Sequence, residues 1–361
     1  MAKRAEEERE LLQPNMREMK LPSRKALKKP AGKKGGGGGG GGFAKGAVVR
    51  TAAQQHHDLC ADTVHDDGVC MVKSVLGKDS AARMYECLAD ELERAYAAVE
   101  DDATVCPQRF NVPHATFDKK RGYLLLPLRD EASERAGTAK DGPLVSALRE
   151  LLTPGATLGE LFQSTCGGVA DEVELFDIVG LRTEAGASRQ CIHSDTPYQK
   201  VPGLFCAFIA LTDVRYEQGT TVFLPGTHKG SKGARGQFDR GQLDRNADEM
   251  LRNHPSRYTS LKAGDAVFFN MNTLHAGQAN MELEEGGGQR LLFILTFRNP
   301  KATAELGHLP NLRLAYRDRG PTQGLMTLAD MQRELAGDDP FAGDHRDGKP
   351  YGDGLLLATS A

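Results

Sequence analysis

The stretch RQCIHSDTPYQK, residues 189–200, places His193 two residues before Asp195. On an extended backbone, residues i and i+2 point to the same side, so these two side chains can reach one point while Ser194 faces away. A Ser-His-Asp hydrolase is disfavoured, because its serine must contact the imidazole directly and the chain has no G-x-S-x-G motif. A metal-binding pair is the interpretation that the spacing favours.

The same spacing recurs at His65/Asp67 and at His345/Asp347. The first pair falls in an expected turn at residues 66–68, and the second lies in a polar segment with no histidine after it. Both pairs are interpreted as surface residues that lie away from a metal centre.

A third ligand is offered by KAGDAVFFNMNTLHAGQAN, residues 262–280, in which His275 follows a predicted strand. Two imidazoles and one carboxylate form the ligand set of non-haem Fe(II) oxygenases, and three positions stay open for a 2-oxo acid and O₂. Zn²⁺ accepts the same donors, so a zinc hydrolase is a rival interpretation. An ordinary histidine at a strand end is the alternative for His275 alone.

Arg290 heads an apolar strand in GGGQRLLFILTF, residues 286–297. If its side chain points inward, it is a buried cation that needs an anionic partner. A guanidinium can bind the distal carboxylate of 2-oxoglutarate through two parallel hydrogen bonds, a contact that a zinc hydrolase does not require. The alternative is a solvent-facing arginine beside a strand.

Four segments together resemble the phytanoyl-CoA dioxygenase family of Fe(II)/2-oxoglutarate oxygenases. They are HSDTPY (193–198), TVFLPGTHKGS (221–231), AGDAVFFNMNTLHAG (263–277) and Arg290. HDDGVCMVKSVL and the helix expected after it are similar to the entrance of the family's domain, so the resemblance covers roughly residues 60–300.

The resemblance implies a double-stranded β-helix, a jelly-roll or cupin-like barrel. It implies Fe(II) held by His193, Asp195 and His275, with 2-oxoglutarate and O₂ as cosubstrates and Arg290 on the C5 carboxylate. Asp195 stands where halogenase variants have Ala or Gly, which disfavours halogenation. One departure is the insertion MELEEGGGQ, residues 281–289, which makes Arg298 a second candidate for the arginine; another is the absence of tryptophan.

Three further residues are candidates for the pocket. Thr196 and Tyr198 follow the ligand pair, and His228 lies in the family's PGTH segment without being a ligand there. Thr196 and Tyr198 are expected to line the pocket. His228 is expected either to shape the site entrance or to serve only in a structural turn.

The remaining elements predict an α+β, mainly β fold with helices packed outside a sandwich or barrel. Residues 79–100 predict an amphipathic helix capped by Asp79 or Ser80, with Met84, Leu88, Leu92, Ala95 and Val99 on one face. Shorter helices are expected at 142–152, 157–163 and 327–335. Closely spaced strands are expected at 173–184, 204–214, 220–228, 265–271 and 290–297.

Three regions are expected along the chain. Residues 1–45 form a basic and glycine-rich tail that is expected to be disordered and to pack against nothing, with eight consecutive glycines at 35–42. Residues 46–310 form the dioxygenase domain, and 311–361 a polar C-terminal extension with one short helix. The basic run favours a solvated tail over nuclear import or nucleic-acid contact.

The composition gives weaker indications. A net charge of −3 and a pI near 6.4 give no general attraction to nucleic acid or to a membrane surface. Seven scattered cysteines without a CxxC favour reduced thiols, and no apolar run is long enough to span a membrane. The cytoplasm is therefore expected, with the nucleus as the alternative that the basic tail suggests.

Taken together, the sequence predicts an Fe(II)- and 2-oxoglutarate-dependent dioxygenase. It is expected to hydroxylate a small lipid-like or secondary-metabolite substrate with release of succinate and CO₂. A non-catalytic binding or regulatory protein on the same scaffold is the alternative, and a zinc hydrolase ranks third. No run of residues selects the primary substrate or an oligomeric state.

Overall fold

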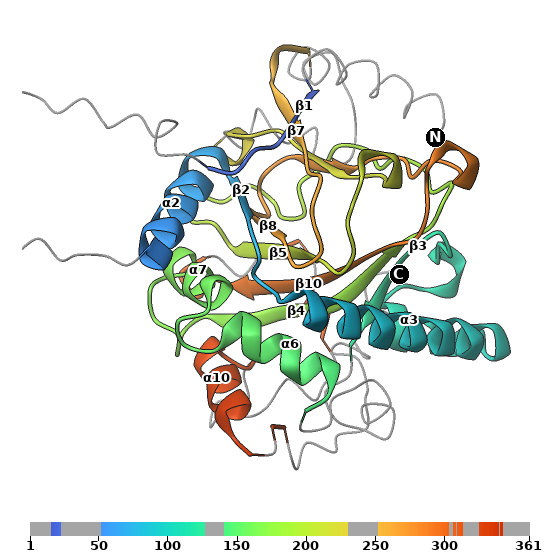
Figure 1. Cartoon of the computed structure of the whole chain (residues 1–361), viewed down its shortest axis with the longest axis horizontal. Helices are drawn as coiled ribbons and strands as arrows, with labels where there is room; N and C mark the ends of the chain where they lie inside the picture. The colour runs from blue at the N-terminus through green and yellow to red at the C-terminus, as the bar shows by residue number, and fades with distance from the viewer. Residues whose placement is uncertain are drawn as a thin grey trace, which may run out of the picture.

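The computed structural model describes residues 16–22, 52–126, 141–229, 252–302, 306–307, 309–312, 325–338 and 340–341. The described part consists of two β-sheets that face each other, with helices on the outside of the larger sheet (Figure 1). The glycine run 35–42 and the His345/Asp347 pair lie outside the described residues.

The larger sheet has six strands, all paired antiparallel. In spatial order they are β2 (Val69–Val72), β8 (Ala266–Asn270), β5 (Leu204–Ala210), β10 (Arg290–Arg298), β4 (Glu174–Thr183) and β3 (Arg121–Leu125). The smaller sheet has the order β1 (Met16–Glu18), β7 (Ser256–Tyr258), β6 (Thr221–Phe223) and β9 (His275–Gly277). The two sheets are not joined into one closed ladder.

The apolar runs of the central strands follow from burial on both faces, because successive side chains of a strand point to opposite sides. On β10, Phe293 and Leu295 belong to the core beneath the helices, whereas Leu292 and Ile294 belong to the core between the two sheets. This explains why RLLFILTF lacks the polar alternation of a half-exposed strand. It also means that every second residue of the larger sheet faces the space in which a site can form.

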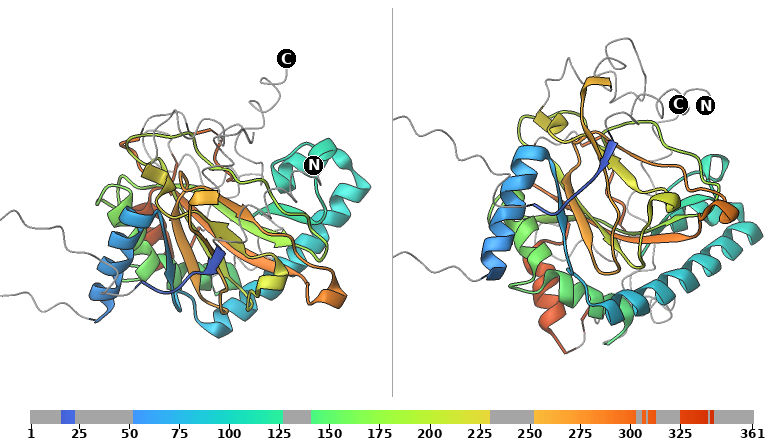
Figure 2. Two further views of the ribbon diagram at one scale, coloured as in Figure 1. Left: turned by 90° about the horizontal axis from the view of Figure 1, so that it is seen from above. Right: turned by 45° about the horizontal axis from the view of Figure 1, so that its top comes forward.

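Four helices cover the outer face of the larger sheet (Figures 1 and 2). They are α3 (Lys78–Asp101), α6 (Pro143–Leu152), α7 (Thr157–Thr165) and α10 (Leu328–Ala336). All four were predicted, and the predicted face of α3 is buried. The predicted cap of α3 is wrong: Gly77 is the N-cap, and the Ser80 hydroxyl donates to Glu150. Helix α10 packs into the same core cluster as α3, while the division into regions at residue 310 stays a prediction.

Helix α2 (Ala52–Asp67) was not predicted. Its sequence is rich in His, Asp and Gln, and it buries only a narrow stripe at Cys60 and Val64, so its periodic signal is weak. The turn expected at residues 66–68 is instead the end of this helix, and Gly68 follows it with φ +79°. The remaining short elements are α4 (Cys106–Phe110) and the 3₁₀ turns Ala103–Val105, His114–Thr116, Tyr216–Gln218, Thr227–Lys229 and Leu283–Glu285.

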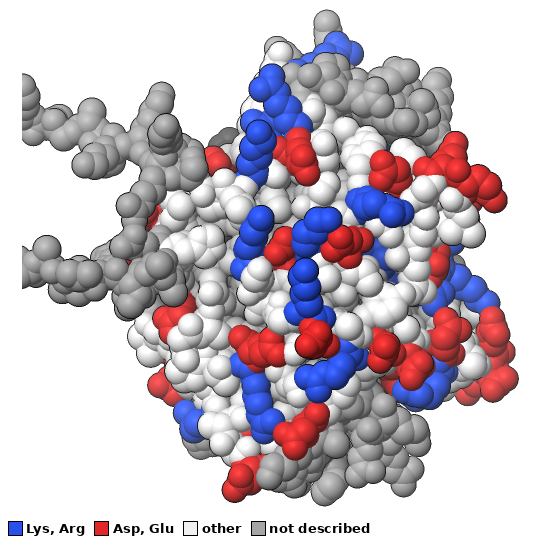
Figure 3. Space-filling model, viewed as in Figure 1, with Lys and Arg blue, Asp and Glu red and all other residues white. Residues whose placement is uncertain are grey.

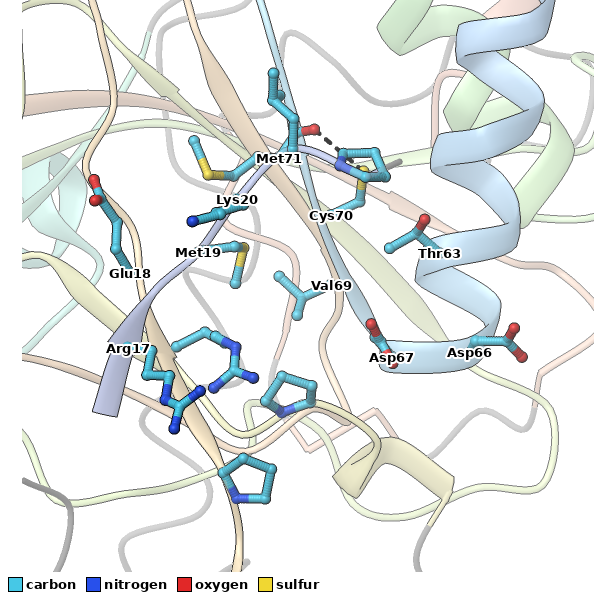
Figure 4. A pocket seen from close by; sticks show the side chains of 15 residues that line it. Arg17, Glu18, Met19, Lys20, Thr63, Asp66, Asp67, Val69, Cys70 and Met71 are labelled. Atoms are coloured by element: carbon cyan, nitrogen blue, oxygen red, sulfur yellow. Dashed lines mark hydrogen bonds between the residues drawn. The ribbon is translucent and has the colours of Figure 1, made fainter. Parts of the chain in front are cut away.

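Part of the N-terminal tail is structured. Strand β1 pairs in parallel with β7, with Arg17 opposite Arg257, and Met19 is buried in the core between the sheets. The expectation that residues 1–45 pack against nothing is therefore wrong for residues 16–22. These residues also form one wall of a hollow of about 820 Å³, whose other wall is the corner between α2 and β2 (Figure 4).

The predicted fold class is confirmed: the chain is a mixed α+β protein dominated by antiparallel sheets with flanking helices. The strand expected at 220–228 is shorter than predicted, because β6 ends at Phe223. All seven cysteines are free thiols. Among the described residues, no helix is long and apolar enough to cross a membrane.

Candidate metal centre

His193, Asp195 and His275 converge on one point. The Nε2 atom of His193 lies 3.4 Å from Asp195 Oδ1, and the Nε2 atom of His275 lies 3.4 Å from Asp195 Oδ2. The candidate ligand atoms of the three residues all lie within 4.8 Å of one another. The two 3.4 Å separations are close to the ~3 Å expected between neighbouring donors around a single ion whose bonds measure about 2.0–2.2 Å.

The backbone of the smaller sheet fixes this convergence. His193 and His275 face each other in an antiparallel bridge with both hydrogen bonds formed, at 3.0 and 2.9 Å. The amide of Asp195 donates to the Met271 carbonyl at 3.1 Å, which attaches the loop after His193 to the end of β8. His193 and His275, 82 positions apart in sequence, are thus held together by main-chain hydrogen bonds, which place their side chains close to each other.

Both imidazoles are oriented in the same way. Nδ1 of His193 donates to the Cys191 carbonyl at 2.8 Å, and Nδ1 of His275 donates to the Thr273 carbonyl at 3.0 Å. A carbonyl oxygen only accepts, so Nδ1 carries the proton and the lone pair lies on Nε2, which faces Asp195. A backbone carbonyl behind each ring is the arrangement that orients histidines for metal binding.

The two histidines differ in exposure. His275 is 4% exposed and packs against the rings of Phe223 and Phe269, with centroid distances of 5.4 and 5.2 Å. Burial lowers the pKa of His275, and the negative charge of Asp195 opposes this effect. The side chains of His193 and Asp195 are 29% and 23% exposed. The cluster therefore has one buried and two accessible donors, so a metal would keep an accessible side.

Arg290 is among the largest fully buried side chains. Nη1 donates to the Gly219 carbonyl, and Nη2 donates to Thr183 Oγ1 at 3.1 Å, while the buried Nε has no partner. Among the described residues, no carboxylate pairs with this guanidinium. Burial, together with the positive charge of Arg121, lowers the pKa of Arg290 to about 9. It remains a cation at neutral pH, with donors to spare for an anion.

The insertion at 281–289 does not move Arg290 off the strand. Asn280 Nδ2 donates to the carbonyls of Thr183 and Gly288 at 3.3 and 2.7 Å, and the Gly288 amide donates back to Asn280 Oδ1. These bonds close the loop, and Arg290 pairs in register with Thr183. Arg298, the second candidate, already pairs with Glu174 at 3.0 Å at the other end of β10.

The three candidate pocket residues lie in different places. The Thr196 hydroxyl is buried and donates to Asn272 Oδ1 at 2.9 Å, and Tyr198 is partly exposed. His228 is 8% exposed, and its Nε2 lies 3.1 Å from the His65 carbonyl at the end of α2. The contacts of His228 thus agree with a structural turn, and its role at an entrance stays a prediction.

Thr227, next to His228, has a clear link to the metal centre. Its hydroxyl donates to the Leu224 carbonyl at 2.6 Å and accepts from the amide of Leu274 at 2.9 Å. Leu274 immediately precedes His275, so Thr227 anchors the start of β9. Thr227 of the PGTH segment therefore supports the strand that carries His275.

Two residues of the space between the sheets were missed by the sequence analysis. Arg121 and Tyr123 lie on β3 with Leu125, which belongs to the core between the sheets, so all three face inward. Tyr123 is 38% exposed despite facing inward, which places its exposed surface between the sheets. Desolvation by the surrounding protein raises the pKa of Tyr123, and the negative charge of Asp195 adds to this effect. The sequence signal that could have identified them is the strand RGYLL, residues 121–125, in which every second side chain points to the same side.

The other HxD pairs among the described residues are not part of the cluster. The His65 side chain is 83% exposed and contacts Asp66. His56 and Asp58 share the spacing but lie on helix α2. A helix turns residues i and i+2 to different sides, so the HxD spacing does not bring these two side chains to one metal ion.

Residues 64–282, more than half of the chain, match the sequence profile described as phytanoyl-CoA dioxygenase (PhyH). Comparison with curated proteins gave no match. Among solved structures, the epimerase SnoN in complex with Fe³⁺, alpha ketoglutarate and nogalamycin RO is 19% identical, with 76% of this chain and 93% of that chain covered and a TM-score of 0.46. AviO1 from Streptomyces viridochromogenes Tue57 is 18% identical, with 69% and 97% covered and a TM-score of 0.45.

The carbocyclase SnoK from nogalamycin biosynthesis is 16% identical, with 71% and 88% covered and a TM-score of 0.46. These TM-scores lie below 0.5, so the assignment rests on the profile match, which begins near the end of α2 and ends in the loop before β10. The match includes the strand pair that holds His193 and His275. The chain belongs to the phytanoyl-CoA dioxygenase family.

Proposed function

We propose that this protein is an Fe(II)- and 2-oxoglutarate-dependent dioxygenase that oxidises a small molecule. The observation that carries the proposal is the cluster of His193, Asp195 and His275, in which each imidazole turns Nε2 toward the carboxylate. Two imidazoles and one carboxylate on one side of an ion are the donor set of non-haem iron oxygenases. When bound, Fe(II) would supply the activation of O₂ coupled to decarboxylation of the 2-oxo acid to succinate and CO₂.

The residues in and around the cluster would have separate roles. His193, Asp195 and His275 would hold the ion, and the carbonyls of Cys191 and Thr273 keep the two imidazoles in the neutral tautomer that a metal requires. Phe223 and Phe269 fix the ring of His275 and exclude water from its side of the site. Cosubstrate and substrate would enter from the accessible side, to which His193 and Asp195 are partly exposed.

Arg290 would bind the distal carboxylate of the 2-oxo acid. Its guanidinium uses two of its five N–H groups on neutral acceptors, which leaves the buried Nε–H and one N–H on each terminal nitrogen. Neighbouring N–H groups of a guanidinium match the two oxygens of a carboxylate. This cation, which has no carboxylate partner among the described residues, favours a 2-oxo acid-dependent oxygenase over a zinc hydrolase, because zinc hydrolysis does not require such a cation.

The substrate is proposed to be a small molecule, lipid-like or a secondary metabolite, and hydroxylation is the reaction that we propose for it. On the face drawn in Figure 3, acidic and basic side chains are interspersed rather than gathered into one basic surface. This distribution gives no support to a nucleic-acid substrate. A binding protein that had lost catalysis would not need all three donors in ligand geometry, and all three are present.

The test is 2-oxoglutarate turnover by protein loaded with Fe(II), measured as succinate in the presence of O₂ and a panel of lipids and small metabolites. Wild-type protein should form succinate, and mass spectrometry should detect a product 16 Da heavier than one panel member. Asp195→Ala should form none, whereas Asp213→Ala, which removes an exposed carboxylate paired with Lys262, should match wild type. Hydrolysis by Zn²⁺-loaded protein without use of 2-oxoglutarate would contradict the proposal.

A further inference from the structure

Arg121 and Arg290 lie in one row across the larger sheet. Thr183 on β4 pairs with Arg121 on one side and with Arg290 on the other. All three side chains point into the space between the sheets, because the next inward row consists of Tyr123, Leu181 and Leu292. The two guanidiniums thus start from strands that flank a single threonine.

Arg121 reaches across to the smaller sheet. Its Nη2 donates to the Ser188 carbonyl at 3.0 Å and to the Gln278 carbonyl at 3.4 Å. A Cβ added to Gly277 would lie 2.5 Å from Arg121 Nη1 and 2.7 Å from Gln190 Oε1. Gly277 therefore leaves the room that the Arg121 guanidinium occupies, and alanine at this position would collide with it.

The position of Gly277 relates Arg121 to the metal centre. It lies on the same strand as His275, two residues further on, and faces the same side. Two residues of a strand span ~6.8 Å, which is comparable to the distance from a metal ion that binds the oxo group of a five-carbon dicarboxylate to its far carboxylate. A 2-oxo acid that chelated an ion held by His275 would bring its distal carboxylate to the level of Gly277, Arg121 and Arg290.

The two arginines have no acidic partner in the described part of the chain. Burial lowers the pKa of both, and the positive charge of Arg121 contributes to the lowered pKa of Arg290. Two other arginines of the same sheet are paired: Arg182 with Glu93 and Glu184, and Arg298 with Glu174. Two neighbouring cations at an interior position are costly unless an anion joins them.

We propose that Arg121 is a second guanidinium of the cosubstrate site, which acts together with Arg290 on the distal carboxylate of the 2-oxo acid, with Gly277 kept small to admit it. This inference rests on the proposed function and adds a residue that touches the cosubstrate. It also makes the site selective for a dicarboxylate, because a 2-oxo acid without the second carboxylate would leave both cations unneutralised.

A purely structural role is the alternative, since Arg121 also joins the two sheets through carbonyls of residues 188 and 278. The two roles are separated by comparing 2-oxoglutarate with 2-oxopentanoate, which has the same chain length but no distal carboxylate. Binding of each acid to the Fe(II)-loaded protein is measured by calorimetry without O₂, so no turnover is required. Thermal unfolding of each variant is recorded alongside.

Arg121→Gln should weaken the binding of 2-oxoglutarate about tenfold or more, since one charge-assisted contact is lost. Its affinity for 2-oxopentanoate should stay within about twofold of wild type, a change of about 0.4 kcal/mol, whereas a tenfold change represents ~1.4 kcal/mol. Gly277→Ala keeps the charge but displaces it, and should show the same selective loss. Arg298→Gln, the control on the same sheet, should change neither affinity.

Unchanged 2-oxoglutarate binding in both Arg121→Gln and Gly277→Ala would overturn the inference and leave the proposed function intact. An equal loss for both acids would assign Arg121 to sheet joining alone and overturn it as well. If the Fe(II)-loaded wild-type protein bound neither acid, the proposed function itself would fail, and the inference with it.

Discussion

Replacing Arg290 by methionine separates its binding role from its structural role. Methionine keeps much of the volume of the side chain and removes the charge and all five N–H groups. In the ligand-free protein the substitution deletes the bonds to the Gly219 carbonyl and Thr183 Oγ1. It also removes a cation that is buried without a carboxylate partner.

The two effects on stability oppose each other. Hydrogen bonds to a charged group contribute about 1.5–3 kcal/mol each, so two of them contribute about 3–6 kcal/mol. Burying an ion costs several kcal/mol, which nearly offsets that gain. We therefore expect Arg290→Met to change the free energy of unfolding by no more than about 2 kcal/mol, against the ~3–5 kcal/mol lost when one partner of a buried ion pair is removed.

The pH of the measurement matters for this comparison. The pKa of Arg290 falls to about 9 in the folded protein, so the folded state holds this proton less tightly than the unfolded state does. The cost of burying the charge is then fully present below pH 9 and diminishes only as the pH rises above 9. Urea unfolding at pH 7.5 compares the variant with the fully charged wild type.

Ligand binding should respond far more strongly than stability. Loss of a two-point contact to the distal carboxylate removes about 1.5–3 kcal/mol, which is about a tenfold to hundredfold weaker affinity for 2-oxoglutarate. Fe(II) binding should survive, because no candidate ligand is changed. Arg298→Met is the matched control, with unchanged affinity expected. The reasoning is refuted if Arg290→Met binds 2-oxoglutarate as wild type does, or if Arg298→Met shows the loss instead.

Three further results are expected. His275→Ala should lose Fe(II) binding by at least about tenfold, measured by metal titration, while the far-UV circular dichroism is retained; a fully retained metal affinity would remove His275 from the ligand set. Met19→Ala should lower the free energy of unfolding by about 2 kcal/mol, because Met19 is buried, whereas Leu21→Ala, at a 37% exposed position, should change it by less than about 0.5 kcal/mol; equal effects would show that β1 does not stay docked in solution. Thr227→Val should cost about 1–3 kcal/mol of unfolding free energy, because the buried Leu274 amide loses its acceptor; an unchanged urea midpoint would contradict that role.

The sequence was informative where one local pattern determined the structure. Helix α3 was predictable from the spacing of Met84 and Leu88 with the apolar residues that follow, and β10 from its unbroken apolar run. The pair His193 and Asp195 was accessible because an extended backbone turns residues i and i+2 to the same side. The third donor, His275, was reached through the strand before it and through the family resemblance.

What was missed depends on contacts between distant segments. Arg121 is a candidate for the cosubstrate site only because β3 pairs with β4 and because Gly277, far along the chain, leaves room for its side chain. Strand β1 has three residues, too few for a periodic signal, and its partner β7 lies more than two hundred positions away. Helix α2 shows so little apolar surface that its stability comes from the elements it packs against.

The docking of β1 has a consequence for the solution behaviour of the protein. Strand β7 would otherwise be the edge of the smaller sheet, with a row of backbone N–H and C=O groups able to pair with another polypeptide. Residues 16–18 cover that row within the same molecule. A shortened form that begins after residue 22 would present an uncovered β7, and self-association through this edge would be the first property to check in any preparation trimmed for crystallisation.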